Sequence, residues 1–122
     1  MIEGIVEFPE ARIQLEVRGR RGLKREIDAV IDTGYTELLS LPPGLITALG
    51  LRWKAFGRAI LADGSECVFD VYSAKVIWDG QVRVIRVDEA DSEPLVGMSL
   101  MKGHVLTMQI RMGGRVTIKR LS

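Results

Sequence analysis

The chain has 122 residues, of which 47% are hydrophobic and 27% are charged, and its formal net charge is +1. This length predicts a single domain, residues 1–122, that buries a core without help from metals or disulfides, and the ordinary composition excludes intrinsic disorder. A nearly neutral chain also argues against a surface built mainly to neutralise phosphates.

One cysteine, Cys67, and one histidine, His104, limit the chemistry that the chain can support. They cannot form an intrachain disulfide or assemble a Cys/His zinc cluster. On its apolar strand Cys67 is expected to be a small core residue, and His104 a surface or strand-start residue. The first residues show no signal-peptide pattern, and no apolar run approaches the ~20 residues that span a bilayer. We expect no metal, no cofactor, no membrane and a cytoplasmic protein.

The first half of the chain predicts strands followed by one short helix. Residues 5–19 predict an alternating strand in which Pro9 marks an edge, bulge or break. Residues 23–31 predict the next strand, which becomes more apolar as it approaches Asp32. Residues 41–51 predict the helix, because proline stands at its start and Gly50 at its end.

The second half of the chain predicts hairpins. Asp63-Gly64 and Asp79-Gly80 each separate runs rich in Val, Ile and aromatic residues, which is a strong hairpin pattern because both turn residues can take a positive φ. Gly113-Gly114 repeats the arrangement near the end of the chain. We expect Trp53, Phe56, Phe69, Tyr72 and Trp78 to pack in the core or an interface. One helix among many hairpins predicts an all-β fold, a closed sheet or barrel.

Asp32-Thr33-Gly34 follows the apolar stretch "AVI". An acid in this position commonly marks the turn where a strand reaches the surface. It can also place a carboxylate in a partly dry site, where a general base is made. Glycine two residues later lets the backbone N–H face the carboxylate, and the threonine hydroxyl can hold a neighbouring loop. The tripeptide alone leaves both interpretations open.

Three segments in order carry a family resemblance: "IDTGYTELLSLP", "LADGS" and "PLVGMSLMKGHVLT". Together they resemble the retropepsin-like aspartic proteases, in particular the small single-domain prokaryotic members, over about residues 5–119. The resemblance implies a retropepsin-type barrel. It also implies that Asp32 is the catalytic acid, Gly34 its backbone donor, and Thr33 the hydroxyl that interlocks two active-site loops.

The resemblance also assigns supporting and substrate-contacting segments. Leu95, Val96 and Gly97 would pack beneath the active-site loop, and strands near the termini would be candidates for a dimer interface. Tyr35 stands where many relatives carry a small residue, so it would narrow the cleft or supply an extra hydroxyl, either touching substrate or packing against Leu38 or a flap residue. A flap closing over a bound peptide would be formed by a hairpin tip: Ala62, Asp63, Gly64 and Ser65. For Asp63 the role of turn acid competes with that of substrate contact.

A protease of this type needs two carboxylates sharing one proton, because like charges ~3 Å apart cannot both ionise. The chain holds one Asp-Thr-Gly and is too short for a second lobe. The resemblance therefore implies a homodimer that pairs Asp32 with its symmetry mate and cleaves peptides between the subunits. The alternative is a catalytically silent module of the same fold that dimerises or binds peptides.

A basic run, residues 18–25, holds five basic residues in "RGRRGLKR". It fits a solvated hairpin tip better than a nucleic-acid surface, because no aromatic residues are interleaved to stack bases. We therefore expect no nucleic-acid partner, although a β-barrel that binds nucleic acid through this run is a third hypothesis. The acidic stretch 88–93 is a candidate to pair with it within or between subunits.

Overall fold

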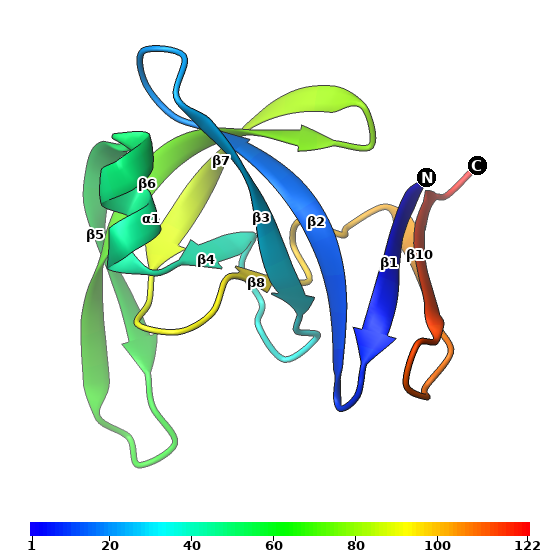
Figure 1. Ribbon diagram of the computed structural model, residues 1–122. Coiled ribbons are helices and arrows are strands. Elements are labelled where there is room, and N and C mark those ends of the chain that lie inside the picture. Colours follow the sequence, from blue (N-terminus) through cyan, green and yellow to red (C-terminus); the bar gives the residue numbers. More distant parts are fainter.

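The computed structural model describes residues 1–122 and contains ten strands and one short helix (Figure 1). The chain is mainly β, as the sequence predicts. In chain order the elements are β1 (Ile2–Glu7), β2 (Glu10–Arg18), β3 (Lys24–Ile31), β4 (Leu39–Leu41), α1 (Pro43–Leu49), β5 (Arg52–Ile60), β6 (Glu66–Trp78), β7 (Gln81–Glu89), β8 (Leu95–Val96), β9 (His104–Met108) and β10 (Arg115–Arg120).

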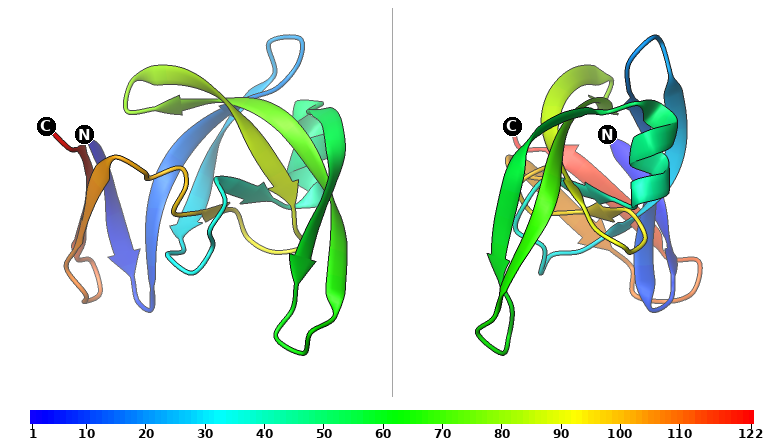
Figure 2. Two further views of the ribbon diagram at one scale, coloured as in Figure 1. Left: turned by 180° about the vertical axis from the view of Figure 1, so that it is seen from behind. Right: turned by 90° about the vertical axis from the view of Figure 1, so that its left-hand side faces the viewer.

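All ten strands belong to one sheet in the order β5-β6-β7-β4-β8-β3-β2-β1-β10-β9. An additional antiparallel pairing of β6 with β2 joins the first and last strands of the series β6-β7-β4-β8-β3-β2. These six strands therefore form a ring (Figures 1 and 2). The closing ladder is short: it pairs Val17 with Val76 and Arg18 with Lys75. The β1, β10 and β9 strands extend the sheet on one side of this ring.

The predicted hairpins form, and their turns differ in detail. Pro9 is a break, because residues 5–19 divide into β1 and β2 around the turn at Phe8–Pro9. Asp79 and Gly80 have φ of 50° and 78°, as expected for a two-residue turn. At the β5–β6 tip only Gly64 has a positive φ, and Leu61 N donates to Ser65 O, so this loop has three residues.

The predicted helix is α1, two residues shorter at each end than expected. It begins directly after Pro42 and ends at Gly50, whose φ of 59° and ψ of 41° let its N–H bond back to the last turn. Leu41 belongs to β4, which has a place in the ring. The helix buries Ile46 and Leu49 against the sheet.

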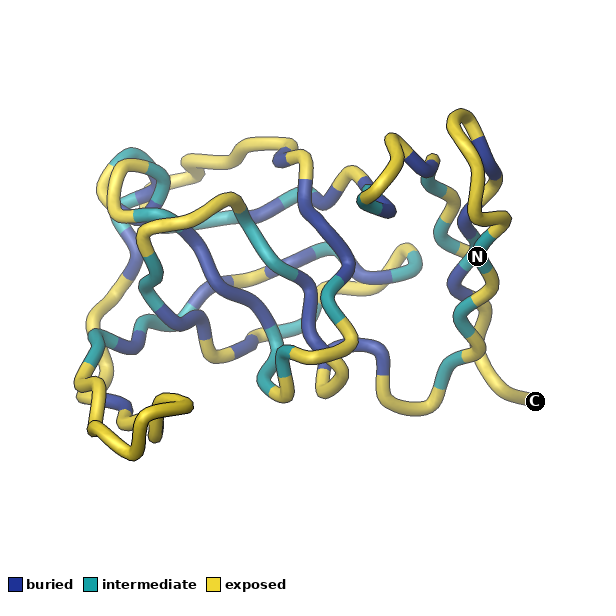
Figure 3. The backbone as a smooth tube through the Cα atoms, turned by 90° about the horizontal axis from the view of Figure 1, so that it is seen from below, coloured by how far each residue is buried: buried dark blue, intermediate teal, exposed yellow.

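The core fills the ring, and buried positions concentrate on its strands (Figure 3). Trp78 is buried there, whereas Trp53 and Phe56 are exposed and pack edge-to-face with ring centroids 5.2 Å apart. These two aromatics therefore do not pack in the core, and the other expected position, an interface, stays a prediction. The expectation for Cys67 is also wrong, because its side chain is exposed. The outer half of the β5–β6 hairpin extends beyond the ring, so nothing in the chain covers its residues (Figures 1 and 2).

Candidate active site

The loop after β3 carries the Asp-Thr-Gly tripeptide. The preceding apolar stretch is buried because β3 lies between β2 and β8, and it ends in the partly buried Asp32. Gly34 N donates to Asp32 Oδ1 at 2.9 Å, and Asp32 N donates to Val96 O at 2.9 Å. The strand thus delivers a carboxylate whose orientation is fixed by a backbone donor. Thr33 beside it is exposed.

The segment Leu95–Gly97 lies directly beside this loop. β8 runs parallel to β3 and pairs Leu95 with Val30, and its other edge pairs with β4. Gly97 N donates to Leu38 O at 3.0 Å. A Cβ atom on Gly97 would lie 2.1 Å from Glu37 O, so only glycine fits this close approach of two backbone segments.

Residues 98 and 99 hold the following part of the loop. Met98 N donates to Tyr35 O at 2.8 Å and Ser99 N to Glu37 O at 3.2 Å. The Ser99 hydroxyl donates to Thr36 O at 2.5 Å. Since the loop has bonds along most of its length, its conformation is set by the segment after β8 and not by the tripeptide alone.

Tyr35 is anchored by a buried carboxylate that sequence reasoning missed. Its hydroxyl donates to Asp88 Oδ2 at 2.6 Å, and Arg86 Nε donates to Asp88 Oδ1 at 2.9 Å. Burial raises the pKa of Tyr35 well above its ordinary value, and the bond to Asp88 raises it further. The hydrogen bond that Arg86 donates to Asp88 raises the pKa of Arg86. No local pattern pointed to Asp88, because it stands 53 positions from Tyr35.

A cleft of about 890 Å³ opens beside this loop. Gly34 and Tyr35 line it, whereas Asp32 itself does not, and β5 and β6 contribute further lining residues, including Arg58 and the exposed Cys67. Leu95 reaches the same cleft. The buried Ser40 also lines it, and its hydroxyl has no hydrogen-bond partner. A space of this size suits a ligand or a short peptide segment.

The expected flap lies at the exposed β5–β6 tip, and its four residues do not line the cleft: Ala62, Asp63, Gly64 and Ser65. The arms of the hairpin line it instead. Asp63 Oδ1 accepts from Ser65 N at 2.8 Å and from the Ser65 hydroxyl, and these bonds lower the pKa of Asp63. In this structure Asp63 acts as a turn residue.

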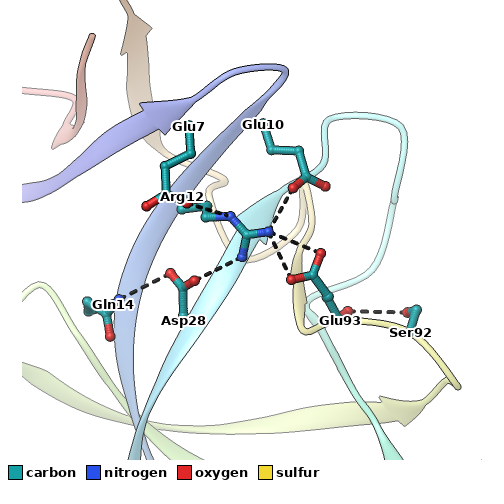
Figure 4. Close-up of polar contacts among 7 residues, drawn as sticks. All are labelled: Glu7, Glu10, Arg12, Gln14, Asp28, Ser92 and Glu93. Atoms are coloured by element: carbon teal, nitrogen blue, oxygen red, sulfur yellow. Dashed lines mark hydrogen bonds and ion pairs between the residues drawn. The ribbon is translucent and has the colours of Figure 1, made fainter. Parts of the chain in front are cut away.

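Arg12 ties the segment before β8 to the first hairpins (Figure 4). Its guanidinium lies 2.7 Å from Glu10, 2.9 Å from Asp28 and 2.8 Å from Glu93. Glu7 is the fourth carboxylate of the group, at 3.6 Å. Only 13% of the Arg12 side chain is exposed, so this network is a well-shielded link between β2, β3 and the residues leading into β8.

His104 and the acidic stretch 88–93, both noted in the sequence, contact other parts of the chain. His104 begins β9, as expected, and its Nε2 accepts a hydrogen bond from Trp78 Nε1 at 3.3 Å. The acidic stretch 88–93 does not pair with the basic run within the chain, because Asp88 bonds Tyr35 and Glu93 bonds Arg12.

No group of three or more His, Cys, Asp or Glu side chains is arranged to hold a metal ion. The chain has no helix of the length and hydropathy that crossing a membrane requires.

Comparison with known proteins gives the fold. The structure is similar to the retropepsin-like aspartic protease from Rickettsia conorii, with a TM-score of 0.59 and 15% identity, covering 100% of this chain and 91% of that one. It is also similar to EIAV protease, solved with the inhibitor HBY-793, with a TM-score of 0.57 and 12% identity, covering 78% and 88% of the two chains. No protein-family model matches the chain, and neither does any curated protein sequence.

The chain therefore has a retropepsin-like fold, as the sequence resemblance implied. Both structural neighbours are aspartic proteases, and this likeness covers most of the chain.

Proposed function

We propose that the chain is an aspartic endopeptidase that works as a homodimer, with Asp32 of each subunit forming the catalytic pair. The observation that carries the proposal is the Asp32 loop: a carboxylate at the end of a buried strand, oriented by Gly34 N at 2.9 Å, beside a cleft of about 890 Å³. In a retropepsin-like fold this is the position at which two subunits can bring their carboxylates together.

In the proposed reaction the two Asp32 carboxyl groups share one proton. The ionised group accepts a proton from a bound water, and the water oxygen attacks the scissile carbonyl carbon. The protonated group donates a hydrogen bond to the carbonyl oxygen, and the proton bound by the first carboxylate passes to the leaving amine. The pair titrates as a unit, so its apparent pKa values belong to the dimer and not to either residue.

Four groups of neighbouring residues have roles in the proposed function. The exposed Thr33 is available to the loop of a second subunit, and Leu95, Val96 and Gly97 hold the loop from within the chain. Tyr35, fixed by Asp88, forms one wall of the substrate cleft. The tip residues Ala62, Asp63, Gly64 and Ser65 form a flap that reaches the peptide after the hairpin moves inward.

The test is cleavage of a mixed peptide library by wild-type protein and by Asp32→Asn, from acidic to neutral pH. We expect the wild type to cleave and the variant to lose at least about 100-fold in rate, as when an essential acid–base group is removed. Glu26→Gln is the matched control, because Glu26 is an exposed carboxylate on the strand that leads to Asp32 and forms no ion pair.

The second part of the test asks whether activity depends on the homodimer. Activity per chain should fall on dilution as the dimer dissociates, measured together with sedimentation of the same samples. Cleavage by Asp32→Asn at the wild-type rate would overturn the proposal. A folded wild-type dimer that cleaves no peptide at any pH would instead assign the chain to the catalytically silent binding modules.

A further inference from the structure

A second hollow, of about 520 Å³, lies at the tip of the β2–β3 hairpin. No carboxylate lines it, and we call it the basic pocket. Its cationic lining residues are Arg18, Arg20, Arg21, Arg52 and Lys75. The basic run seen in the sequence is therefore one part of a larger group of charges.

The remaining two cations come from distant parts of the chain. The pairing that closes the ring places Lys75 of β6 directly opposite Arg18 of β2. Arg52 begins β5 and pairs with Ser73 on the same β6 strand. Figures 1 and 2 show the β2–β3 tip at the top of the molecule near α1, at the opposite end of β3 from the Asp32 loop.

The charges of the basic pocket are mostly unpaired. Arg18 lies 2.7 Å from Glu16, and none of the other four cations lies within 4.0 Å of a carboxylate. Like charges directly opposite each other destabilise a sheet, and Arg18 and Lys75 stand in this relation at a ladder of only two residue pairs. A bound anion would remove this repulsion.

The hairpin tip is held in place before any ligand arrives. Arg20 N donates to Leu49 O at 3.2 Å, and Arg20 Nε donates to Gly50 O at 2.7 Å, at the carbonyl end of α1. A Cβ atom on Gly19 would lie 1.7 Å from Leu49 O, which shows how closely the two segments approach. Fixing the cations beforehand lowers the entropy cost of binding.

Arg21 holds an unfavourable backbone conformation at this tip. Its φ is 58° and that of Gly22 is 72°, a two-residue turn in which asparagine or glycine is strongly favoured at the first position. Arginine is unfavourable in this backbone conformation, so its presence here indicates that the cationic side chain has a function.

We propose that the basic pocket binds a compact anion carrying several phosphate groups, such as a short polyphosphate. Guanidinium and ammonium groups form strong charge-assisted bonds to phosphate oxygens. The volume suits a small molecule, and no aromatic side chain lines the pocket to stack a base. The proposal is independent of peptidase activity, since the pocket shares no residue with the cleft beside Asp32.

Calorimetric titration with tripolyphosphate tests the proposal, at ionic strengths of about 0.01 M and 0.15 M, where the screening length falls from ~30 Å to ~8 Å. We expect one saturable site per chain. The double variant Arg52→Gln with Lys75→Gln should weaken it at least about tenfold, because two phosphate contacts are lost. Neither residue makes a side-chain hydrogen bond to the rest of the chain, so the variant should fold.

The matched control is Arg115→Gln with Lys119→Gln, two exposed cations of β10 outside the pocket. It removes the same net charge and should change the affinity less than about twofold, since long-range effects are screened at 0.15 M. Asp32→Asn should bind like the wild type, which separates this proposal from the peptidase.

Three results would overturn the proposal. Tripolyphosphate that fails to saturate at low ionic strength would show that there is no site. An equal loss of affinity in the pocket and control variants would show that net charge alone attracts the anion. A single-stranded oligonucleotide that binds at least about tenfold more tightly than tripolyphosphate, with a steep salt dependence, would assign the pocket to nucleic acid.

Discussion

Two hollows of opposite charge lie at opposite ends of β3. Two arginines and five carboxylates line the cleft beside Asp32, whereas five cations and no carboxylate line the basic pocket. Eight residues of strand separate the ends by roughly 25 Å. The net charge of +1 conceals this separation, so a bulk charge close to neutral does not exclude a local anion site.

The hollows also differ in how their charged groups are satisfied. In the cleft, Asp88 bonds both Tyr35 and Arg86, so these charges have protein partners that position the wall. In the basic pocket, Arg21, Arg52 and Lys75 have none. The pairing of Asp88 indicates a role in holding structure, and the three unpaired cations of the basic pocket are free to bind a ligand.

The largest effect on stability is expected from Gly97→Ala, at the cleft end. The new methyl would meet Glu37 O at 2.1 Å and Tyr35 O at 2.8 Å, and backbone atoms cannot move aside cheaply. We expect the free energy of unfolding to fall by more than about 3 kcal/mol, measured by urea denaturation.

Gly22→Ala, in the basic pocket, is the variant with which Gly97→Ala is compared. Its φ is 72° and nothing lies within 4 Å of the added methyl, so only the backbone conformation costs energy, about 1 kcal/mol. Equal losses in the two variants would contradict the close approach described for Gly97.

Tyr35→Phe should have an intermediate effect. It removes a hydrogen-bond donor from the buried Asp88, which should cost about 1–3 kcal/mol at neutral pH. Tyr72→Phe is the control, because its hydroxyl does not bond Asp88 and the variant should lose less. Denaturation of both variants measures the difference.

The same variant has a distinct signature at alkaline pH. Burial raises the pKa of Tyr35 in the folded protein. The protonated hydroxyl therefore adds its full share to the free energy of unfolding below about pH 10, the pKa of unfolded tyrosine. This stabilisation is lost as the pH rises from there toward the folded pKa. Above pH 10 the wild type should lose stability faster than Tyr35→Phe, by at most about 1.4 kcal/mol per pH unit, since solvent reaches the half-buried hydroxyl. Parallel curves would show that Tyr35 ionises equally in both states.

The smallest change, and one of opposite sign, is expected for Arg21→Asn in the basic pocket. Asparagine tolerates the left-handed conformation, and Asn-Gly is the favoured pair for this turn, so stability should rise by about 0.5 kcal/mol. Tripolyphosphate affinity should fall in the same variant. A stabilised variant with unchanged affinity would remove Arg21 from the site.

The elements that could be predicted are those with a local cause. The strand that ends at Asp32, the turn at Asp79-Gly80 and the helix stop at Gly50 each depend on neighbouring residues, and each is present. The order of the motif segments was enough to indicate the fold, which the structural neighbours share.

What could not be predicted depends on contacts between distant residues. Cys67 and Phe56 lie on apolar strands, but whether a strand is covered is decided by the rest of the fold, and the outer β5–β6 hairpin has no cover within this chain. Asp88 finds Tyr35 across 53 positions. Likewise Lys75 lies beside the basic run only because β6 pairs with β2.

The short β6–β2 ladder is one of three places where the ring can open, because β3–β8 and β4–β8 also have only two residue pairs each. Two residue pairs close it, whereas β6 and β7 share eight, so local unfolding that separates β6 from β2 breaks far fewer bonds than any route through the long ladders. Val17 and Val76 at this seam are fully buried, so opening admits water directly into the core. The β6–β2 seam is thus one part of the barrel at which local opening would expose the core to proteolysis and to exchange of its amides.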